Sequence, residues 1–351
     1  MLWATYAAVG GFAQIPIGAL SDKLGARKLP IFVAGMVAAV SYSLYPLAES
    51  TITFVLLFAA SGIGFFGGGT IAAAMVADIT AGKGSTAGGF GIVRIWGSIG
   101  WIAALVCVTL FPEISRGQGL PYLIASLFLA SAFSILIAHQ LPLRAAAAAS
   151  LSEARSLLFN SRLVLFLAAF LMYYMAQTST MSFLSLYLKE LGSGESLIAI
   201  AFAISAVVEI PFILAVGPMS DRIGRRPLLL VAFFALPFRL FAYSMVGNPA
   251  SVLWIQLFHG VTFGVMVVVS LAYVADLSPP GLRATGQALL AITAAVASTL
   301  GLYIGGLVAD AAGLPQMYIF LAAIALLGGV LFLIFGRESL ARETRNQYYP
   351  S

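Results

Sequence analysis

The chain has 351 residues, of which 61% are hydrophobic and 9% charged, and its mean hydropathy is +1.02. Polar side chains are too few to cover the surface of a water-soluble globule. This composition therefore excludes a soluble domain and indicates a membrane protein. With a single cysteine, Cys107, and two histidines, the sequence predicts neither an internal disulfide nor a metal cluster, and we expect no cofactor.

Long apolar runs follow one another along the whole chain. Crossing the hydrocarbon core takes about 20 mostly apolar residues, and in lipid a helix satisfies its backbone amides within its own segment. The sequence predicts eleven spans, in chain order Leu2–Leu20, Leu29–Leu47, Ile52–Ala77, Gly88–Phe111, Leu120–Leu141, Leu163–Leu186, Leu197–Met219, Pro227–Met245, Ser251–Leu277, Thr285–Val308 and Met317–Phe335. We therefore expect an all-α integral membrane fold.

Basic residues gather on one side of this topology. If the loops alternate between the two sides, one face holds Lys23, Arg27, Lys28, Lys83, Arg144, Arg155, Arg162, Arg222, Arg225, Arg226, Arg283, Arg337, Arg342 and Arg345, and the other holds Arg116 and Lys189. Basic loops stay in the cytoplasm, so we expect a multi-pass protein of the cytoplasmic (inner) membrane with its C-terminus inside. The net charge of +5 then reflects topology, and we expect no nucleic-acid partner.

Two motifs occur twice at nearly the same offset. "GALSDKLGARK" at Gly18 returns as "GPMSDRIGRRP" at Gly217, with its aspartates 199 residues apart, and "VADIT" returns as "VADLS" after 198 residues. The chain therefore reads as two copies of one unit. The predicted organisation is a helical bundle at 1–141, a cytoplasmic linker at 142–162, a second bundle at 163–336 and a cytoplasmic tail at 337–351.

The repeat also predicts a helix that the sequence does not contain. Shifting the span Leu163–Leu186 back by one repeat places its counterpart before Met1, so eleven helices of an expected twelve are present, in two pseudo-repeated six-helix bundles. Either the gene begins further upstream or the chain is a natural fragment. The start "MLWATYAAVGG" has no leading basic residue and does not resemble a cleaved signal peptide.

The repeated hinge, G-x-x-S-D-x-x-G-x-[RK]-[RK], resembles the signature loop of the major facilitator superfamily, and the resemblance covers essentially the whole chain. It rests on Gly18, Ser21, Asp22, Lys23, Gly25, Arg27 and Lys28 and on Gly217, Ser220, Asp221, Arg222, Gly224, Arg225 and Arg226. It implies that Asp22, Arg27, Asp221 and Arg225 latch the two halves in the outward-open state. The alternative is a basic anchor at the membrane surface with no gating role.

Small residues recur every fourth position in two spans, at Ala60, Gly64, Gly68 and Ala72 and at Ala297, Gly301, Gly305 and Ala309. Such strips allow close helix packing. Two repeated halves also suit alternating access around a site near the bilayer midplane.

Only three charged residues lie well inside the predicted spans: Arg94, Glu209 and Arg239. Together with the titratable His259, they are candidate functional residues, because charge is expensive within a bilayer. We expect Glu209, Arg239 and His259 to carry proton coupling. The alternatives are a structural ion pair between two helices and a histidine that only bonds a neighbouring helix.

The segment "RIWGSIGW" places Trp101 about two turns beyond Arg94, with Gly97 and Ser98 between them on the same face. A cation, a gap and an indole plane form a cradle for a ringed ligand. The alternative is that Arg94 extends to the cytoplasmic surface and Trp101 only packs.

"FGIVRIWGSIGW" resembles the fifth helix of the oligosaccharide and nucleoside proton symporters, whose matching arginine and tryptophan contact substrate. Glu209, Arg239 and His259 resemble the coupling residues of the lactose permease branch. Two departures argue against lactose itself. Thr262 stands where that branch has a carboxylate one turn after the histidine, and Val76 lies near the position where that branch has its sugar-binding carboxylate.

We therefore expect a secondary transporter, a proton-coupled symporter of a small ringed solute such as a sugar, nucleoside or aromatic acid, acting as a monomer. The alternatives are proton-driven efflux of lipophilic compounds and a transport-inactive sensor or scaffold. We expect no enzyme, because the sequence shows neither H-E-x-x-H nor a serine and histidine pair. It also shows no ATP-binding loop, which agrees with transport driven by protons.

Overall fold

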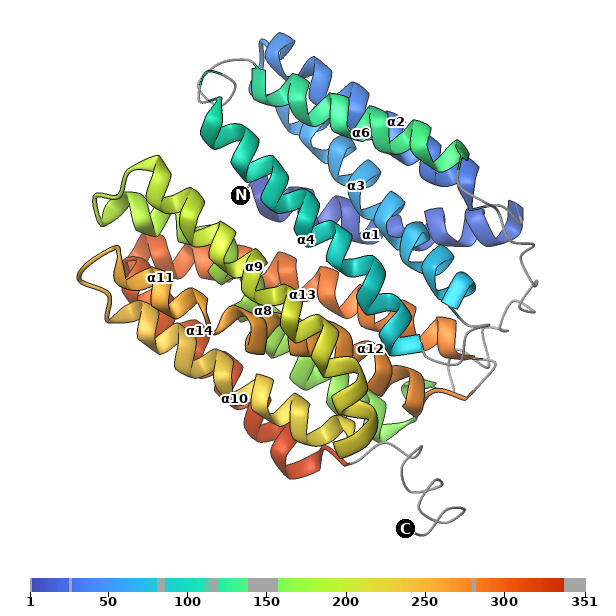
Figure 1. The fold of residues 1–351 in the computed structure, drawn as a ribbon, viewed down its shortest axis with the longest axis vertical. Coiled ribbons are helices and arrows are strands. Elements are labelled where there is room, and N and C mark those ends of the chain that lie inside the picture. The colour runs from blue at the N-terminus through green and yellow to red at the C-terminus, as the bar shows by residue number, and fades with distance from the viewer. Residues whose placement is uncertain are drawn as a thin grey trace. The chain divides into compact units, whose positions relative to one another are not determined.

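The structure is a computed structural model that describes residues 2–24, 27–80, 86–111, 113, 119–137, 157–279 and 282–337. Within these ranges the regular structure is helical (Figure 1). The elements are α1 (Leu2–Leu24), α2 (Lys28–Leu44), the 3-10 turn η1 (Tyr45–Leu47), α3 (Thr51–Thr80), α4 (Thr86–Leu110), α6 (Gly119–Ile137), α8 (Ser161–Glu190), α9 (Glu195–Ile223), α10 (Arg225–Ser244), α11 (Ser251–Gln256), the π-helical η3 (Gly260–Gly264), α12 (Val265–Leu277), α13 (Arg283–Ala312) and α14 (Leu314–Phe335).

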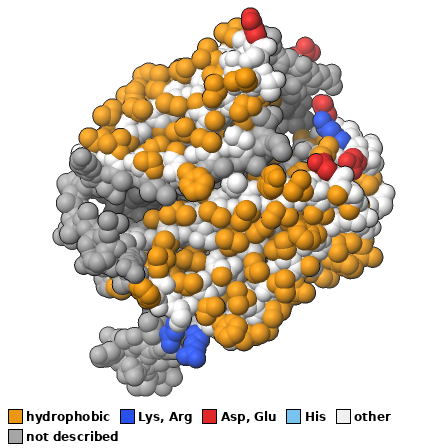
Figure 2. Space-filling model, turned by 180° about the vertical axis from the view of Figure 1, so that it is seen from behind, with side chains coloured by type: hydrophobic (Ala, Val, Ile, Leu, Met, Phe, Trp, Pro, Cys, Tyr) orange, Lys and Arg blue, Asp and Glu red, His pale blue; other side chains and the backbone are white. Residues whose placement is uncertain are grey.

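Helical segments lie in each of the eleven predicted spans, so the expected all-α membrane fold is confirmed. Within the described residues, nine helical segments are long and apolar enough to cross a membrane. On the face shown in Figure 2, hydrophobic side chains predominate and charged ones form a few small groups. This surface suits a multi-pass protein surrounded by lipid. The expected tail lies almost wholly outside the described residues, as does most of the linker.

Sharp turns separate consecutive helices at two glycines. Gly224, with φ +100°, lies between α9 and α10, and Gly313, with φ +94°, lies between α13 and α14. A positive φ strains residues that carry a Cβ, so glycine suits both positions. Gly224 thus allows a tight reversal in the second hinge, whereas Gly25 lies outside the described residues.

Contacts along the chain define two compact units. The first comprises Met1–Gly84 and Val106–Ala148, and the second comprises Ser85–Leu105 and Ala149–Ser351. In this division α4 belongs in large part to the second unit, where Ile95 packs against the core. The bundle boundaries expected at 141 and 163 stay a prediction.

In the first unit α3 packs against α1 and α2, and α2 lies beside α6 (Figure 1). The second unit has a dense core, in which α8 and α10 flank α14, with Tyr173, Phe233 and Phe332 fully buried between them. Arg239 is also fully buried in this unit.

The predicted strips of small residues lie where helices approach closely. A Cβ added to Gly64 would lie 2.8 Å from the Ala38 backbone nitrogen of α2. A Cβ added to Gly301 would lie 2.8 Å from the Met175 Cα of α8. The predicted close packing is therefore confirmed at Gly64 and Gly301, and the structure shows that α3 meets α2 and α13 meets α8 there.

Candidate functional site

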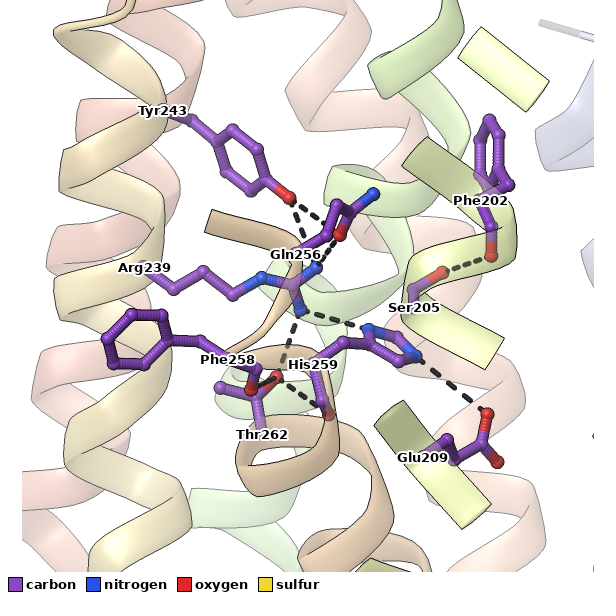
Figure 3. A network of polar contacts seen from close by, with 9 residues as sticks. All are labelled: Phe202, Ser205, Glu209, Arg239, Tyr243, Gln256, Phe258, His259 and Thr262. Atoms are coloured by element: carbon purple, nitrogen blue, oxygen red, sulfur yellow. Dashed lines mark hydrogen bonds and ion pairs between the residues drawn. The ribbon is translucent and has the colours of Figure 1, made fainter. Parts of the chain in front are cut away.

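Three segments of the second unit bring the predicted coupling residues together. Glu209 comes from α9, Arg239 from α10, and His259 from the helical turn just before η3 (Figure 3). They are 5%, 0% and 6% exposed, respectively. The structure therefore groups the three residues that the sequence selected by their charge and depth.

Arg239 is the centre of this cluster. Its Nη1 lies 2.9 Å from the Thr262 hydroxyl and 3.1 Å from His259 Nδ1. Its Nη2 donates to Gln256 Oε1 at 2.6 Å and to the Tyr243 hydroxyl at 3.1 Å. These neutral partners replace much of the hydration that a buried guanidinium loses, and hydrogen bonds to charged groups are the stronger kind.

The contact with Arg239 fits one tautomer of His259. A guanidinium can only donate hydrogen bonds, so His259 Nδ1 must accept this one and carry no proton. A doubly protonated imidazolium cannot make the same contact. The Arg239 contact therefore fits the tautomer of His259 that carries its proton on Nε2.

That Nε2 is directed at Glu209. The distance from His259 Nε2 to Glu209 Oε2 is 4.0 Å, which is longer than a direct hydrogen bond (Figure 3). The imidazole ring thus lies between the Glu209 carboxyl group and the Arg239 guanidinium. A proton gained or lost at Glu209 changes the charge balance of a site that water scarcely reaches.

The helical span that carries His259 is interrupted at this point. The Val265 amide donates to the Gly260 carbonyl, closing a π-type turn over Gly260–Gly264. Tyr173 of α8 donates its hydroxyl to the Thr262 carbonyl at 2.5 Å. Wide helical turns of this kind frequently occur at functional sites. Here the turn carries Thr262, and His259 directly precedes it.

Sequence reasoning missed three buried polar residues of the second unit, two of which bond Arg239. Gln256 and Tyr243 bond Arg239 and also each other, at 3.0 Å between Tyr243 OH and Gln256 Oε1. Gln177 on α8 is 2% exposed, and neither of its amide atoms has a hydrogen-bond partner among the described residues. All three are uncharged, so a search for intramembrane charge passed over them.

The residues predicted on α4 are described only in part. The Arg94 side chain lies outside the described part of the structure. Ser98 is 3% exposed, whereas Gly97 is exposed and Trp101 is 54% exposed. Trp101 and Gly97 thus share an accessible face of α4, and the role of the cradle in substrate binding stays a prediction.

The second hinge is tied together by Arg225. This side chain pairs with Asp221 at 2.6 Å and with Asp276 of α12 at 3.3 Å, and it also donates to the Ser220 hydroxyl. In the first hinge Arg27 donates to the Ser21 hydroxyl at 3.3 Å, whereas the Asp22 side chain lies outside the described part. Both arginines therefore bond the serine that precedes the hinge aspartate.

Long apolar helices with charged side chains buried between them define a multi-pass membrane protein. The sequence profile of the MFS_1 like family matches residues 9–320. The chain therefore belongs to this family of the major facilitator superfamily, which confirms the resemblance carried by the hinges.

Relatives and solved structures agree with this assignment. The chain is 26% identical to the maltose permease of Geobacillus stearothermophilus over 263 residues, covering 74% of the chain and 66% of that permease. It is 25% identical to an uncharacterized MFS-type transporter of Mycobacterium tuberculosis over 395 aligned positions, covering 98% of the chain and 86% of the relative. A match to the multi-drug resistance efflux pump PmrA of Streptococcus pneumoniae is 26% identical and covers 48% of the chain and 43% of the pump.

Among solved structures, the nucleoside transporter NupG, as a D323A mutant, superposes with a TM-score of 0.76 at 19% identity, over 96% of this chain and 90% of that one. The human organic anion transporter MFSD10 superposes with a TM-score of 0.69 at 20% identity, over 94% of this chain and 82% of that one. Both similarities concern the fold.

Proposed function

We propose that the protein is a proton-coupled symporter that imports a small ringed solute by alternating access. The observation that carries this proposal is the buried linkage of Glu209, His259 and Arg239 across three helical segments. Intramembrane groups of this kind mark ion and proton pathways in membrane proteins.

Glu209 is the proposed proton-binding group. When it is ionised, its negative charge balances Arg239 through neutral His259. When Glu209 is protonated, the Arg239 guanidinium keeps only uncharged hydrogen-bond partners in the described network. The two protonation states therefore favour different arrangements of α9 and α10, which would couple the proton to a conformational change.

The proposed solute is polar as well as ringed. The Gln177 amide offers a buried donor and a buried acceptor, and such groups are almost always satisfied by a partner. Arg94 and Trp101, with Gly97 and Ser98, are the proposed substrate contacts on α4. The names of the maltose permease and the NupG nucleoside transporter agree with a hydroxyl-rich, ringed solute.

The rest of the expected organisation belongs to the same proposal. We place the protein in the cytoplasmic membrane as a monomer with its C-terminus inside, built of bundles at 1–141 and 163–336. Asp22, Arg27, Asp221 and Arg225 are the proposed gating residues of the hinges.

Solute-driven proton uptake tests this function. De-energised cells that express the protein are suspended in weak buffer, and maltose, uridine and 4-hydroxybenzoate are added in turn while external pH is recorded. We expect one solute to raise external pH, and Glu209→Gln to abolish the rise. Asp310→Asn, which alters an exposed carboxylate of α13, is the control and should retain it.

Proton-driven efflux of lipophilic compounds is the second candidate, favoured by the match to the PmrA pump. It predicts no alkalinisation by any of the three solutes and a proton-dependent loss of a preloaded dye such as ethidium. If correctly inserted protein shows neither alkalinisation nor proton-dependent dye loss, the third possibility, a membrane sensor or scaffold, would be favoured.

A further inference from the structure

Two glycines of the π-turn η3 receive one side chain from α9. A Cβ added to Gly260 would overlap the ring of Phe212, with Cε2 only 2.8 Å away. A Cβ added to Gly264 would lie 3.1 Å from Phe212 Cβ and 3.5 Å from the Glu209 carbonyl oxygen. The Phe212 ring therefore fills a notch that exists only because residue 260 lacks a side chain.

This notch lies beside the charged cluster. Phe212 is one helical turn beyond Glu209 on α9, and Gly260 directly follows His259. The same two segments thus meet twice: through Phe212 and Gly260, and through Glu209 and His259, 4.0 Å apart. Both contacts must shift together if the two segments slide or tilt.

The backbone of α9 is weakened between these two side chains. Pro211 lies inside α9 and has no backbone N–H, so the helical hydrogen bond to the carbonyl of residue 207 is missing. A helix that lacks this bond bends more easily there. Packing of Phe212 in the notch then holds α9 at the point where this backbone hydrogen bond is missing.

We propose that Phe212 is a positioning residue that, seated in the Gly260 notch, holds the Glu209 carboxylate opposite His259. It touches neither proton nor solute in this role. The ring fixes the spacing between α9 and η3, and this spacing fixes the distance across which Glu209 and His259 interact. The inference deepens the proposed function and rests on it, because the Glu209–His259 distance matters for transport only if these two residues couple the proton.

Nitrogen NMR of His259 tests the inference without a solute. The sequence has two histidines, so in the full-length protein carrying His139→Gln and ¹⁵N-labelled histidine, His259 is the only source of ring signals. The Arg239 contact predicts one protonated and one unprotonated ring nitrogen. We expect Phe212→Ala and Gly260→Ala each to shift both signals, and the double variant to move them back toward their original positions because the new methyl group occupies the vacated space.

Gly306→Ala is the matched control, since its Cβ would lie 3.6 Å from the Phe183 ring, an ordinary contact. Unshifted signals in folded Phe212→Ala protein would overturn the inference. A double variant whose signals do not move back would also overturn it. Where Gly260→Ala alone fails to fold, a double variant that also fails to fold would overturn it. If Glu209→Gln leaves solute-driven alkalinisation intact, the proposed function fails, while the ring signals still decide the role of Phe212.

Discussion

Lys28 in the first unit and Arg226 in the second make the same kind of contact with the end of a helix. Lys28 Nζ donates to the Leu136 carbonyl of α6 at 3.1 Å. Arg226 donates to the Gly336 and Leu333 carbonyls, at 2.6 and 2.9 Å, where α14 ends. The last carbonyls of a helix lack intrahelical donors and attract cations. The hinge thus has a structural task in each unit, in addition to its proposed gating role.

Loss of the Arg226 cap should weaken the second unit. We expect Arg226→Gln to lower the free energy of unfolding by about 1 kcal/mol, because it removes a cation from the end of α14. Thermal unfolding of the purified protein in detergent measures this loss. Arg222→Gln, which removes an exposed charge from the same hinge, should leave the midpoint nearly unchanged. Equal losses in both variants would refute a specific cap.

The geometry of Arg225 separates a latch from a simple basic anchor. Its Nε faces Asp276 and its Nη2 faces Asp221, a forked arrangement that a lysine ammonium cannot reproduce. We expect Arg225→Lys to recover less than half of the stability and uptake rate lost in Arg225→Ala. Unfolding midpoints and initial uptake rates measure the two effects. Full recovery by lysine would favour the anchor, because an anchor requires only positive charge.

The sequence was informative where hydropathy and charge carry the signal. Glu209, Arg239 and His259 stood out because ionisable residues are rare inside spans, and the structure brings them together. The spans were located because apolar runs stop at loops, although α8 and α9 extend beyond their predicted ends. The small-residue strip at Gly301 predicted a close helix contact for a similar reason, since spacing alone identifies one face of a helix.

Other features left no such signal. Gln256 and Tyr243 are ordinary polar residues by composition, and only the fold shows that both bond Arg239. The π-turn at Gly260–Gly264 lies inside the continuous apolar span Ser251–Leu277, so hydropathy could not reveal it. The notch for Phe212 depends on two segments meeting, which is tertiary information.

Close packing between α13 and α8 predicts a graded response to an added methyl group. At Gly301 a Cβ would lie 2.8 Å from the Met175 Cα, so the helices must separate, whereas at Gly305 it would lie 3.4 Å from the Ser179 hydroxyl. We expect Gly301→Ala to cost about 1–3 kcal/mol of stability and Gly305→Ala far less. Thermal unfolding of the two variants checks the order. A larger loss at Gly305 would contradict the packing seen here.

The hydrogen bond from Arg239 to Thr262 should contribute more to stability than a hydrogen bond of similar geometry between two neutral groups. Thr262→Val keeps the shape of the side chain but removes one of the two acceptors of Arg239 Nη1, the hydroxyl 2.9 Å away in a fully buried site. Because this bond involves a charged donor, we expect a loss of about 1.5–3 kcal/mol.

Thr178→Val provides the matched comparison, since Thr178 Oγ1 and Ser298 Oγ form a neutral pair at 3.2 Å. We expect that change to cost about 1 kcal/mol. Thr262→Ser retains the hydroxyl and should preserve more stability than Thr262→Val. Unfolding midpoints of the three variants decide the comparison. If Thr262→Val costs no more than Thr178→Val, the Arg239 charge does not depend on this acceptor, and its other partners are sufficient.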